Sequence, residues 1–380
     1  MERKFLGSPE LTLRQKLWQI HWAFVFMLVV MAAVGFAMLY SAANGDAEPW
    51  ANRHAIRFAF GLTMMIGVAL VDIRFWLRYA YVIYFFVLLL LVAVDFGGFM
   101  GMGARRWINL GFINLQPSEL MKVAMVLALA RFFHGSSLED LPRPQALIVP
   151  LVIVAAPTAL VLRQPDLGTA LILLLTGAGL FFVAGIRLWK FGLLGVLGLI
   201  SAPIAWQFMH EYQRRRVLTF LDPEKDPLGA GYHIIQSKIA FGSGGLSGRG
   251  FMQGTQGHLN FLPEMQTDFI FTMLAEEFGL IGALLLLSLY ILMLIYGFAI
   301  ALRSRSHFGC LLAMGVTSTF FMYVFINIAM VMGLIPVVGV PLPLISYGGT
   351  AMMALLFGFG LLMGVSVHRD VMIGRRGATS

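Results

Sequence analysis

Apolar runs of about 20 residues recur along this chain from Trp22 to Val365, and they constrain its fold more than any other feature. A helical run of that length crosses a hydrocarbon core about 30 Å thick. Because backbone polar groups inside a bilayer must bond to one another, these runs are expected to be helices. The sequence therefore predicts an all-α, polytopic integral membrane protein with a single transmembrane domain over residues 1–380.

The runs predict about ten transmembrane helices. Their approximate bounds are 19–41, 55–72, 77–96, 117–134, 146–162, 167–185, 189–209, 268–299, 308–334 and 347–367. With the N-terminus inside, fifteen lysines and arginines fall in cytoplasmic segments and five fall in outer loops or helix mouths. Since positive residues concentrate on the cytoplasmic side, both termini are predicted to be cytoplasmic. One large outer loop, 210–267, then lies between spans seven and eight.

The composition excludes several classes of function. The net charge of +8 comes from 27 Lys and Arg against 19 Asp and Glu, a balance that we attribute to membrane topology and not to nucleic-acid binding. The single cysteine, Cys310, allows neither a disulfide nor a cysteine metal site within one chain. The eight histidines have no metal-ligand spacing, so no zinc site is predicted.

The large outer loop has its own local signals. RRRVLTFL and YHIIQSKIAF place aliphatic residues three and four apart beside basic ones, which predicts two amphipathic helices at the membrane surface. GSGGLSGRG at 242–250 is rich in glycine but lacks the G-K-[ST] ending of a phosphate-binding P-loop. It is interpreted as a loop that needs positive φ angles.

Charged side chains gather on the predicted outer side, where they suggest an anionic ligand. Arginine forks bind phosphate oxygens in pairs, and a lipid diphosphate would be reached from this leaflet. The alternative for the run Arg214, Arg215 and Arg216 is a solvated helix face that contacts lipid phosphates. Glu119 and Lys122, three apart on one helix, either neutralise each other or serve a function at membrane depth.

Asp268 is the most specific candidate for chemistry. Thr267 is a plausible N-cap that would place Asp268 in the first turn of a long apolar helix, where the helix dipole favours the ionised carboxylate. Asp268 then either caps the helix or acts as a general base toward a sugar hydroxyl. Glu264 is a second acid, a metal ligand or a turn residue. Glu276 and Glu277 lie two turns deeper, and at least one is expected to face the bundle interior.

Two further segments depart from plain transmembrane helix. Asn327 in FINIAM and the run GLIPVVGVPLPLISYGG predict a non-helical segment, which is tolerated at membrane depth only where protein or a cavity covers it. Trp107, beside Arg105 and Arg106, is either an aromatic residue of the membrane interface or a ring that stacks on sugar or lipid.

Several long motifs occur in a fixed order from about residue 100 onward. They are RRWINLG, LQPSELMK, RQPDLGTA, DPLGAGYHIIQSKIAFGSGGLSGRGF, FLPEMQTDFIF and GVPLPLISYGG. In order and spacing they resemble the SEDS proteins, the shape, elongation, division and sporulation proteins of bacteria, and the loop segment resembles the elongation members more than the division members. The resemblance implies a peptidoglycan glycosyltransferase that polymerises lipid II, the undecaprenyl-diphosphate disaccharide-pentapeptide, into nascent glycan at the outer face of the inner membrane during cell elongation and shape maintenance.

The resemblance also implies roles for individual residues. Asp268 matches the essential carboxylate of the family, and it is expected to be catalytic. Trp107, Glu119, Lys122 and Asp166 match positions in or near the family's central cavity. The residues expected to bind substrate are Arg105, Arg106, Trp107, Glu119, Lys122, Asp166, Arg214, Arg215, Arg216, Lys238 and Glu264. Gln266 departs from the pattern, because many relatives have a histidine there, and no role of that histidine is transferred.

The arginines would stabilise the departing diphosphate, with or without a divalent cation such as Mg²⁺, and no other cofactor is expected. Alternative functions are a lipid II flippase or transporter, which ten spans would also suit, and a scaffold for a synthase.

Implied partners are a class B penicillin-binding protein with transpeptidase activity and other membrane proteins of the elongation machinery. This chain has no S-x-x-K nucleophile on the outer side with which to cross-link glycan itself. The partner's transmembrane helix is expected near spans eight and nine, where MGVTSTFFM offers small residues for close packing. These are Gly315, Thr317, Ser318 and Thr319.

Overall fold

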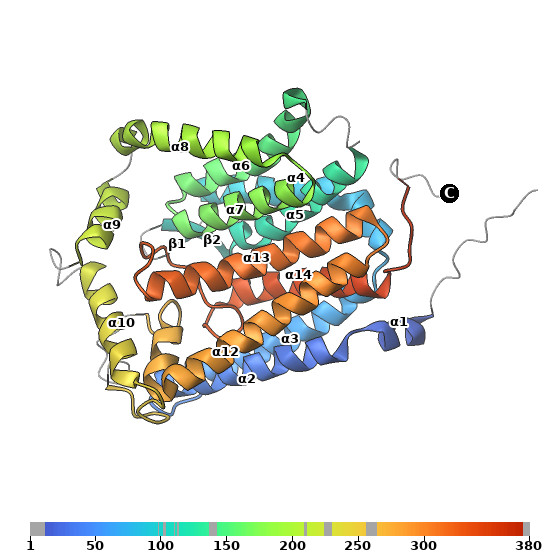
Figure 1. The fold of residues 1–380 in the computed structure, drawn as a ribbon. Coiled ribbons are helices and arrows are strands. Elements are labelled where there is room, and N and C mark those ends of the chain that lie inside the picture. The colour runs from blue at the N-terminus through green and yellow to red at the C-terminus, as the bar shows by residue number, and fades with distance from the viewer. Residues whose placement is uncertain are drawn as a thin grey trace, which may run out of the picture.

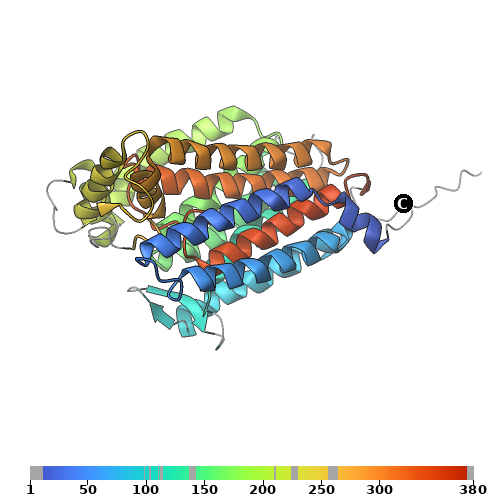
Figure 2. The same ribbon diagram turned by 90° about the horizontal axis from the view of Figure 1, so that it is seen from below.

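The computed structural model describes residues 12–97, 99–101, 104–109, 111, 114–136, 143–208, 211–223, 230–255 and 264–374. These residues are predominantly helical, as predicted, and most of the helices run side by side along one axis (Figures 1 and 2). The first half contains α1 (Leu13–Gln19), α2 (Trp22–Ala42), α3 (Ala51–Leu70), α4 (Ile73–Gly97), α5 (Pro117–Gly135), the 3₁₀ helix η1 (Pro144–Leu147), α6 (Ile148–Arg163) and α7 (Leu167–Val183). The second half contains α8 (Leu188–Phe208), α9 (Glu211–Leu221), α10 (Ala230–Gly244), α12 (Ile270–Arg303), α13 (His307–Val331) and α14 (Gly349–Val367).

Seven of the described helices are long and apolar enough to cross a membrane: α2, α3, α4, α6 together with part of η1, α12, α13 and α14. The prediction of a polytopic membrane protein is confirmed at this level. The remaining predicted spans correspond to α5, which carries Glu119, Lys122 and Arg131, and to α7 and α8, whose apolar stretches are shorter.

The core of the bundle is built around α13 and α14. Helix α13 packs against α12, α7, α5 and α14, and α14 packs closely against α3. The small residues of α13 serve this internal packing: a Cβ on Gly315 would lie 2.5 Å from Cγ1 of Val126, and the hydroxyl of Thr317 lies against Gly297. The expectation that the small residues of 314–322 face a partner helix is therefore wrong, because neighbouring helices of the same chain already occupy that space.

The two ends of the bundle differ. Helix α1 and the described C-terminal residues lie at one end, and α9 and α10 lie across the other (Figure 1). The two helices predicted in the segment 210–267 are thus present, and their position at the membrane surface stays a prediction. The same end carries an antiparallel sheet of three short strands, β1 (Phe99–Gly101), β2 (Ala104–Asn109) and β3 (Asn114–Leu115), in the order β1-β2-β3, which was not predicted.

Helix α12 is divided by a kink that the sequence analysis did not predict. Gly279 has φ 66° and ψ −162°, so the helix consists of a short first segment and a long second one. The glycine-rich loop supplies hydrogen-bond acceptors to the backbone at the kink. The N–H groups of Leu280 and Ile281 donate to the carbonyls of Gly245 (3.0 Å) and Leu246 (3.1 Å). Gly245, Gly248 and Gly250 of this loop have positive φ, as expected.

The segment 332–348 is non-helical, which confirms the predicted break between the last two spans. Protein covers it on several sides. A Cβ on Gly35 of α2 would lie 2.6 Å from the carbonyl oxygen of Leu344, and a Cβ on Gly168 of α7 would lie 2.9 Å from that of Val338. The Tyr290 hydroxyl donates to the carbonyl of Pro343 at 2.7 Å. The covered segment forms a fixed surface beside the start of α12.

Candidate active site at one end of the bundle

Asp268 lies just before α12 and not inside its first turn as predicted. The N-cap is Phe269, and residues 264–269 form turns. The side chain is half-buried beside segment 332–348, where a Cβ on Gly339 would lie 3.4 Å from its Oδ2. The pKa of Asp268 is raised to about 7. Removal of the carboxylate from water is the largest cause and the nearby Glu264 adds to the rise, whereas the positive charge of Arg216 opposes it. Such a carboxyl group can accept a proton near neutral pH.

A second carboxylate, Asp166, lies close enough to Asp268 to raise the pKa of that residue as well. Asp166 is the N-cap of α7, and its Oδ1 accepts a hydrogen bond from the backbone N–H of Thr169 at 3.1 Å. The side-chain amide of Gln116 donates to its Oδ2 at 3.4 Å. Arg106 of β2 supports the turn before α7 by donating to the carbonyls of Gln164 and Pro165. Arg106 therefore positions Asp166 through the backbone.

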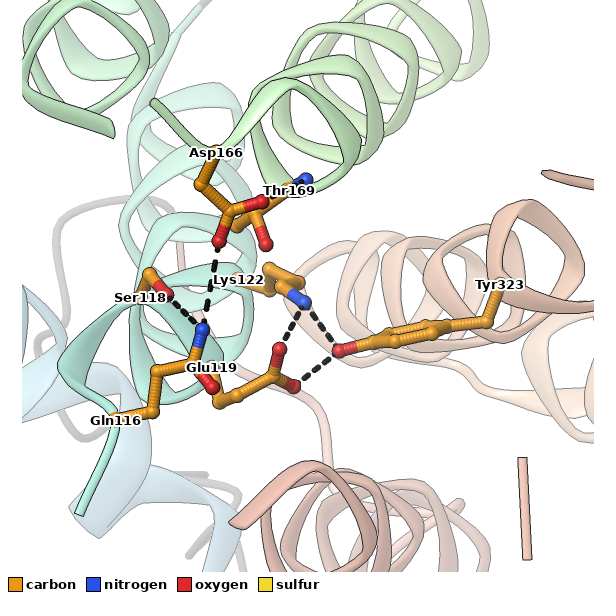
Figure 3. A network of polar contacts seen from close by, with 7 residues as sticks. All are labelled: Gln116, Ser118, Glu119, Lys122, Asp166, Thr169 and Tyr323. Atoms are coloured by element: carbon orange, nitrogen blue, oxygen red, sulfur yellow. Dashed lines mark hydrogen bonds and ion pairs between the residues drawn. The ribbon is translucent and has the colours of Figure 1, made fainter. Parts of the chain in front are cut away.

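Glu119 and Lys122 form a buried ion pair at the start of α5 (Figure 3). The Nζ of Lys122 lies 2.7 Å from Oε1 of Glu119, and the two residues are 1% and 4% exposed. The hydroxyl of Tyr323 on α13 accepts from Lys122 and donates to Glu119, which closes a three-residue network. The network lines a cavity between α5, α13 and α14, and Tyr323 also lines a second cavity beside segment 332–348. The ion pair predicted from spacing is present, and Tyr323 completes it.

The three consecutive arginines have different surroundings. Arg214 donates to the carbonyls of Trp206 (3.0 Å) and Gln207 (2.7 Å) and so caps the end of α8. Arg216 acts electrostatically on Asp268. The side chains of Arg215 and Arg105 lie outside the described residues. Of the two whose side chains the structure describes, Arg216 is the one that acts on the Asp268 carboxylate.

The other predicted residues lie on three different elements. Glu264 is exposed on the turn before Asp268, and Thr267 donates to its side chain at 3.3 Å. Lys238 of α10 is exposed, and its Cε would lie 2.8 Å from a Cβ on Gly333. Trp107 is half-buried on β2.

Sequence reasoning missed two polar residues of α13. Tyr323 enters the ion-pair network, and Asn327, which had been interpreted only as a sign of broken helix, bonds to the backbone of Asp268. Their spacing of four residues places both on one face of a helix that is otherwise apolar there. That pattern is the signal that would have indicated them.

Comparison with known proteins identifies the family. A sequence profile for cell cycle proteins of the FtsW, RodA and SpoVE type matches residues 15–371. This chain belongs to the FtsW/RodA/SpoVE family. The resemblance to SEDS proteins is thereby confirmed.

Individual members of the FtsW/RodA/SpoVE family are similar over nearly their full length. Peptidoglycan glycosyltransferase MrdB of Escherichia coli K12 is 45% identical over 356 residues, which are 93% of this chain and 96% of that protein. Stage V sporulation protein E of Bacillus subtilis is 38% identical over 90% of this chain and 95% of its own length.

Solved structures give the same assignment. The rod shape determining protein RodA of Thermus thermophilus matches with a TM-score of 0.70 and 30% identity, over 92% of this chain and 97% of that one. A chain from a peptidoglycan synthase complex, described as coordinating polymerization and crosslinking, matches with a TM-score of 0.79 and 34% identity, over 92% and 98% of the two chains.

Proposed function

We propose that this chain is a peptidoglycan glycosyltransferase that polymerises lipid II, with Asp268 as the general base. The acceptor sugar hydroxyl gives its proton to the Asp268 carboxylate as its oxygen attacks the anomeric carbon of the donor. A new glycosidic bond forms, the bond between that carbon and the diphosphate oxygen breaks, and the lipid diphosphate leaves. Attack from the side opposite the leaving group inverts the anomeric centre.

The observation that carries this proposal is the half-buried carboxylate of Asp268 just before α12, whose pKa is raised to about 7. A general base works best when its pKa lies near the operating pH, because it is then both largely ionised and sufficiently basic. Arg216 is the described cation that acts on this carboxylate, and a guanidinium there is suited to the charge that develops on the departing diphosphate.

A divalent cation such as Mg²⁺ stays a prediction for this site. Among the described residues, no group of three or more His, Cys, Asp or Glu side chains comes together in a way that could hold a metal ion. Mg²⁺ is usually held by one or two carboxylates together with substrate phosphates, so a divalent cation bound with the substrate stays a prediction. The proposed reaction assigns no step to one.

The proposed site faces the outside of a bacterial inner membrane. We assign ten crossings, to α2 through α8 and to α12, α13 and α14, with both termini in the cytoplasm and the large loop, 210–267, outside. The distribution of positive residues supports this orientation, and the end of the bundle that carries α9 and α10 is opposite to α1 (Figure 1).

The proposed partner is a class B penicillin-binding protein that cross-links the growing strand. The similarity to a chain of a peptidoglycan synthase complex supports this proposal. The contact surface must differ from the small residues of α13, since those are buried within this chain. Other membrane proteins of the elongation machinery remain proposed partners by family membership.

Polymerisation of fluorescent lipid II by the purified protein in detergent tests the function. The wild-type protein is expected to make glycan polymer, and Asp268→Asn is expected to lower the rate by about 10²–10⁴-fold, because the amide cannot accept the proton. Asp370→Asn is the matched control, since it makes the same change at an exposed carboxylate shortly after α14. Detergent leaves no second compartment, so a flippase or transporter would give no product. Absence of polymer from well-folded wild-type protein, with its penicillin-binding partner supplied, would refute the proposal.

A further inference from the structure

The three carbonyl groups that lead into Asp268 are each bound by a group from a distant part of the chain. The backbone N–H of Tyr347 donates to the carbonyl of Gln266 at 2.8 Å, and the hydroxyl of Ser346 donates to the carbonyl of Thr267 at 2.5 Å. The side-chain amide of Asn327 donates to the carbonyl of Asp268 at 3.0 Å. Residues 266–268 are thus held by α13 and by segment 332–348. The bonded residues are 59 positions apart in the sequence for Asn327 and Asp268, and 79 for Ser346 and Thr267.

Asn327 makes two of these connections at once. Its Nδ2 also donates to the carbonyl of Val340 at 2.7 Å, so one amide joins the backbone of Asp268 to segment 332–348. Both acceptors are carbonyl oxygens, which fixes the amide orientation, because only the NH₂ group can donate to them. Asn327 is 0% exposed and Ser346 is 3% exposed, so water does not compete for these bonds in the folded protein.

We infer that Asn327 is a positioning residue for the glycosyltransferase reaction, which it serves by holding the backbone of Asp268 against segment 332–348 so that the carboxylate stays half-buried at the site. Ser346 assists by holding Thr267. Neither residue needs to touch substrate for this role. The inference rests on the proposed function, since it concerns the placement of the proposed base.

Geometry of this kind affects rate more than binding. A displacement of about 1 Å in a catalytic group can lower the rate about 10²-fold while distant substrate contacts persist. Loss of the Asn327 amide also leaves two buried carbonyls without their donor, so the turn is expected to relax toward water. The carboxylate of Asp268 would then become better hydrated.

Better hydration has a predictable effect on the pH dependence. In the wild-type protein, burial and Glu264 and Asp166 raise the pKa of Asp268 to about 7, while Arg216 and the hydrogen bond with Thr267 lower it. The base must be ionised, so activity falls as the pH drops through this value. If the carboxylate gains water, its pKa falls toward the ordinary value, and the acid limb of the pH–rate profile moves to lower pH.

The experiment compares Asn327→Ala, Ser346→Ala and Thr317→Val by polymerisation of fluorescent lipid II across pH, with rates normalised to folded protein. Asn327→Ala is expected to lower kcat by about 10–100-fold, to change KM by less than about 3-fold, and to move the acid limb down by roughly one pH unit. Ser346→Ala removes a single hydroxyl and is the second variant in case Asn327→Ala does not fold. It is expected to show the same changes to a smaller degree.

Thr317→Val is the matched control. Thr317 is a buried polar residue of the same helix, 2% exposed, and its hydroxyl bonds only within α13, to the carbonyl of Ala313 at 2.7 Å. It should retain the wild-type rate and pH profile. An unmoved acid limb and unchanged kcat in both Asn327→Ala and Ser346→Ala, or an equal loss in Thr317→Val, would overturn the inference. Asp268→Asn distinguishes failure of the proposed function from failure of the positioning role. If Asp268→Asn stays active, Asp268 is not the general base. If Asp268→Asn is inactive and the Asn327 and Ser346 variants are unchanged, only the positioning role is wrong.

Discussion

Lys122 is 1% exposed, and burial of its charge is tolerated because neighbouring groups compensate that charge. Lys122 is held by Glu119 at 2.7 Å and by the Tyr323 hydroxyl, and its Nζ lies 4.2 Å from the centre of the Tyr323 ring. Buried ion pairs gain little over apolar replacements, but removal of one partner leaves an uncompensated charge. The pair therefore makes the fold sensitive to single substitutions at either position.

We predict that Lys122→Met destabilises the protein by about 3–5 kcal/mol, because the Glu119 carboxylate is then buried without its cation. Thermal unfolding in detergent measures the effect as a lower Tm. The double variant Lys122→Met with Glu119→Gln serves as the control, and it should recover a large part of the loss, since neither buried charge remains. A single variant that melts with the wild-type protein would show that water or another group already compensates Glu119.

At the scale of single residues, local spacing predicted some of the site and could not predict the rest. Glu119 and Lys122 are three apart on one helix, so their pairing follows from helix geometry. Tyr323 and Asn327 act across about 200 and 60 residues of sequence, and no local pattern states which segment they will meet. The divergent roles of Arg214 and Arg216 depend likewise on where α8 ends and where Asp268 lies.

At the scale of elements, hydropathy predicted helices well and their interruptions poorly. Long apolar runs identify α2, α4, α13 and α14, because burial in lipid acts on the whole run. The strands β1 to β3 are too short for an alternating pattern to be visible. The kink in α12 falls inside an apolar run, and it exists because the loop 245–250 supplies the backbone partners that the helix loses at Gly279.

We predict that Gly279→Ala destabilises the protein by about 1–3 kcal/mol, the usual cost of a strained backbone position. Its φ of 66° suits glycine, and a Cβ there would lie 2.3 Å from the backbone nitrogen of Gly248. Thermal unfolding in detergent is the measurement. Gly67→Ala in α3 is the matched control, since no atom lies within 4 Å of its Cβ and alanine favours helix. If both variants melt alike, the kink does not need its glycine.

At the scale of the whole molecule, the position of the two ends limits the number of crossings. Helix α1 and the described C-terminal residues lie at the same end of the bundle (Figure 1), which requires an even number of crossings. Seven long apolar helices alone would place the ends on opposite sides. The proposed total of ten adds α5, α7 and α8, which are less apolar or shorter than the seven. Helix α5 carries charged residues that are partly paired inside the protein, and the apolar stretches of α7 and α8 are short.

The orientation of the bundle can be tested with single cysteines, because Cys310 is the only native one. In a Cys310→Ser background, Gln253→Cys places an exposed thiol on the loop after α10, and Arg305→Cys places one on the exposed turn between α12 and α13. If the site faces outward, a membrane-impermeant maleimide added to spheroplasts should label only Gln253→Cys, and permeabilised membranes should allow labelling of both. The background protein, which has no thiol, is the control for non-specific reaction. Labelling of Arg305→Cys in intact spheroplasts would place the termini outside, and Asp268 could then not act on a lipid-linked sugar at the outer face.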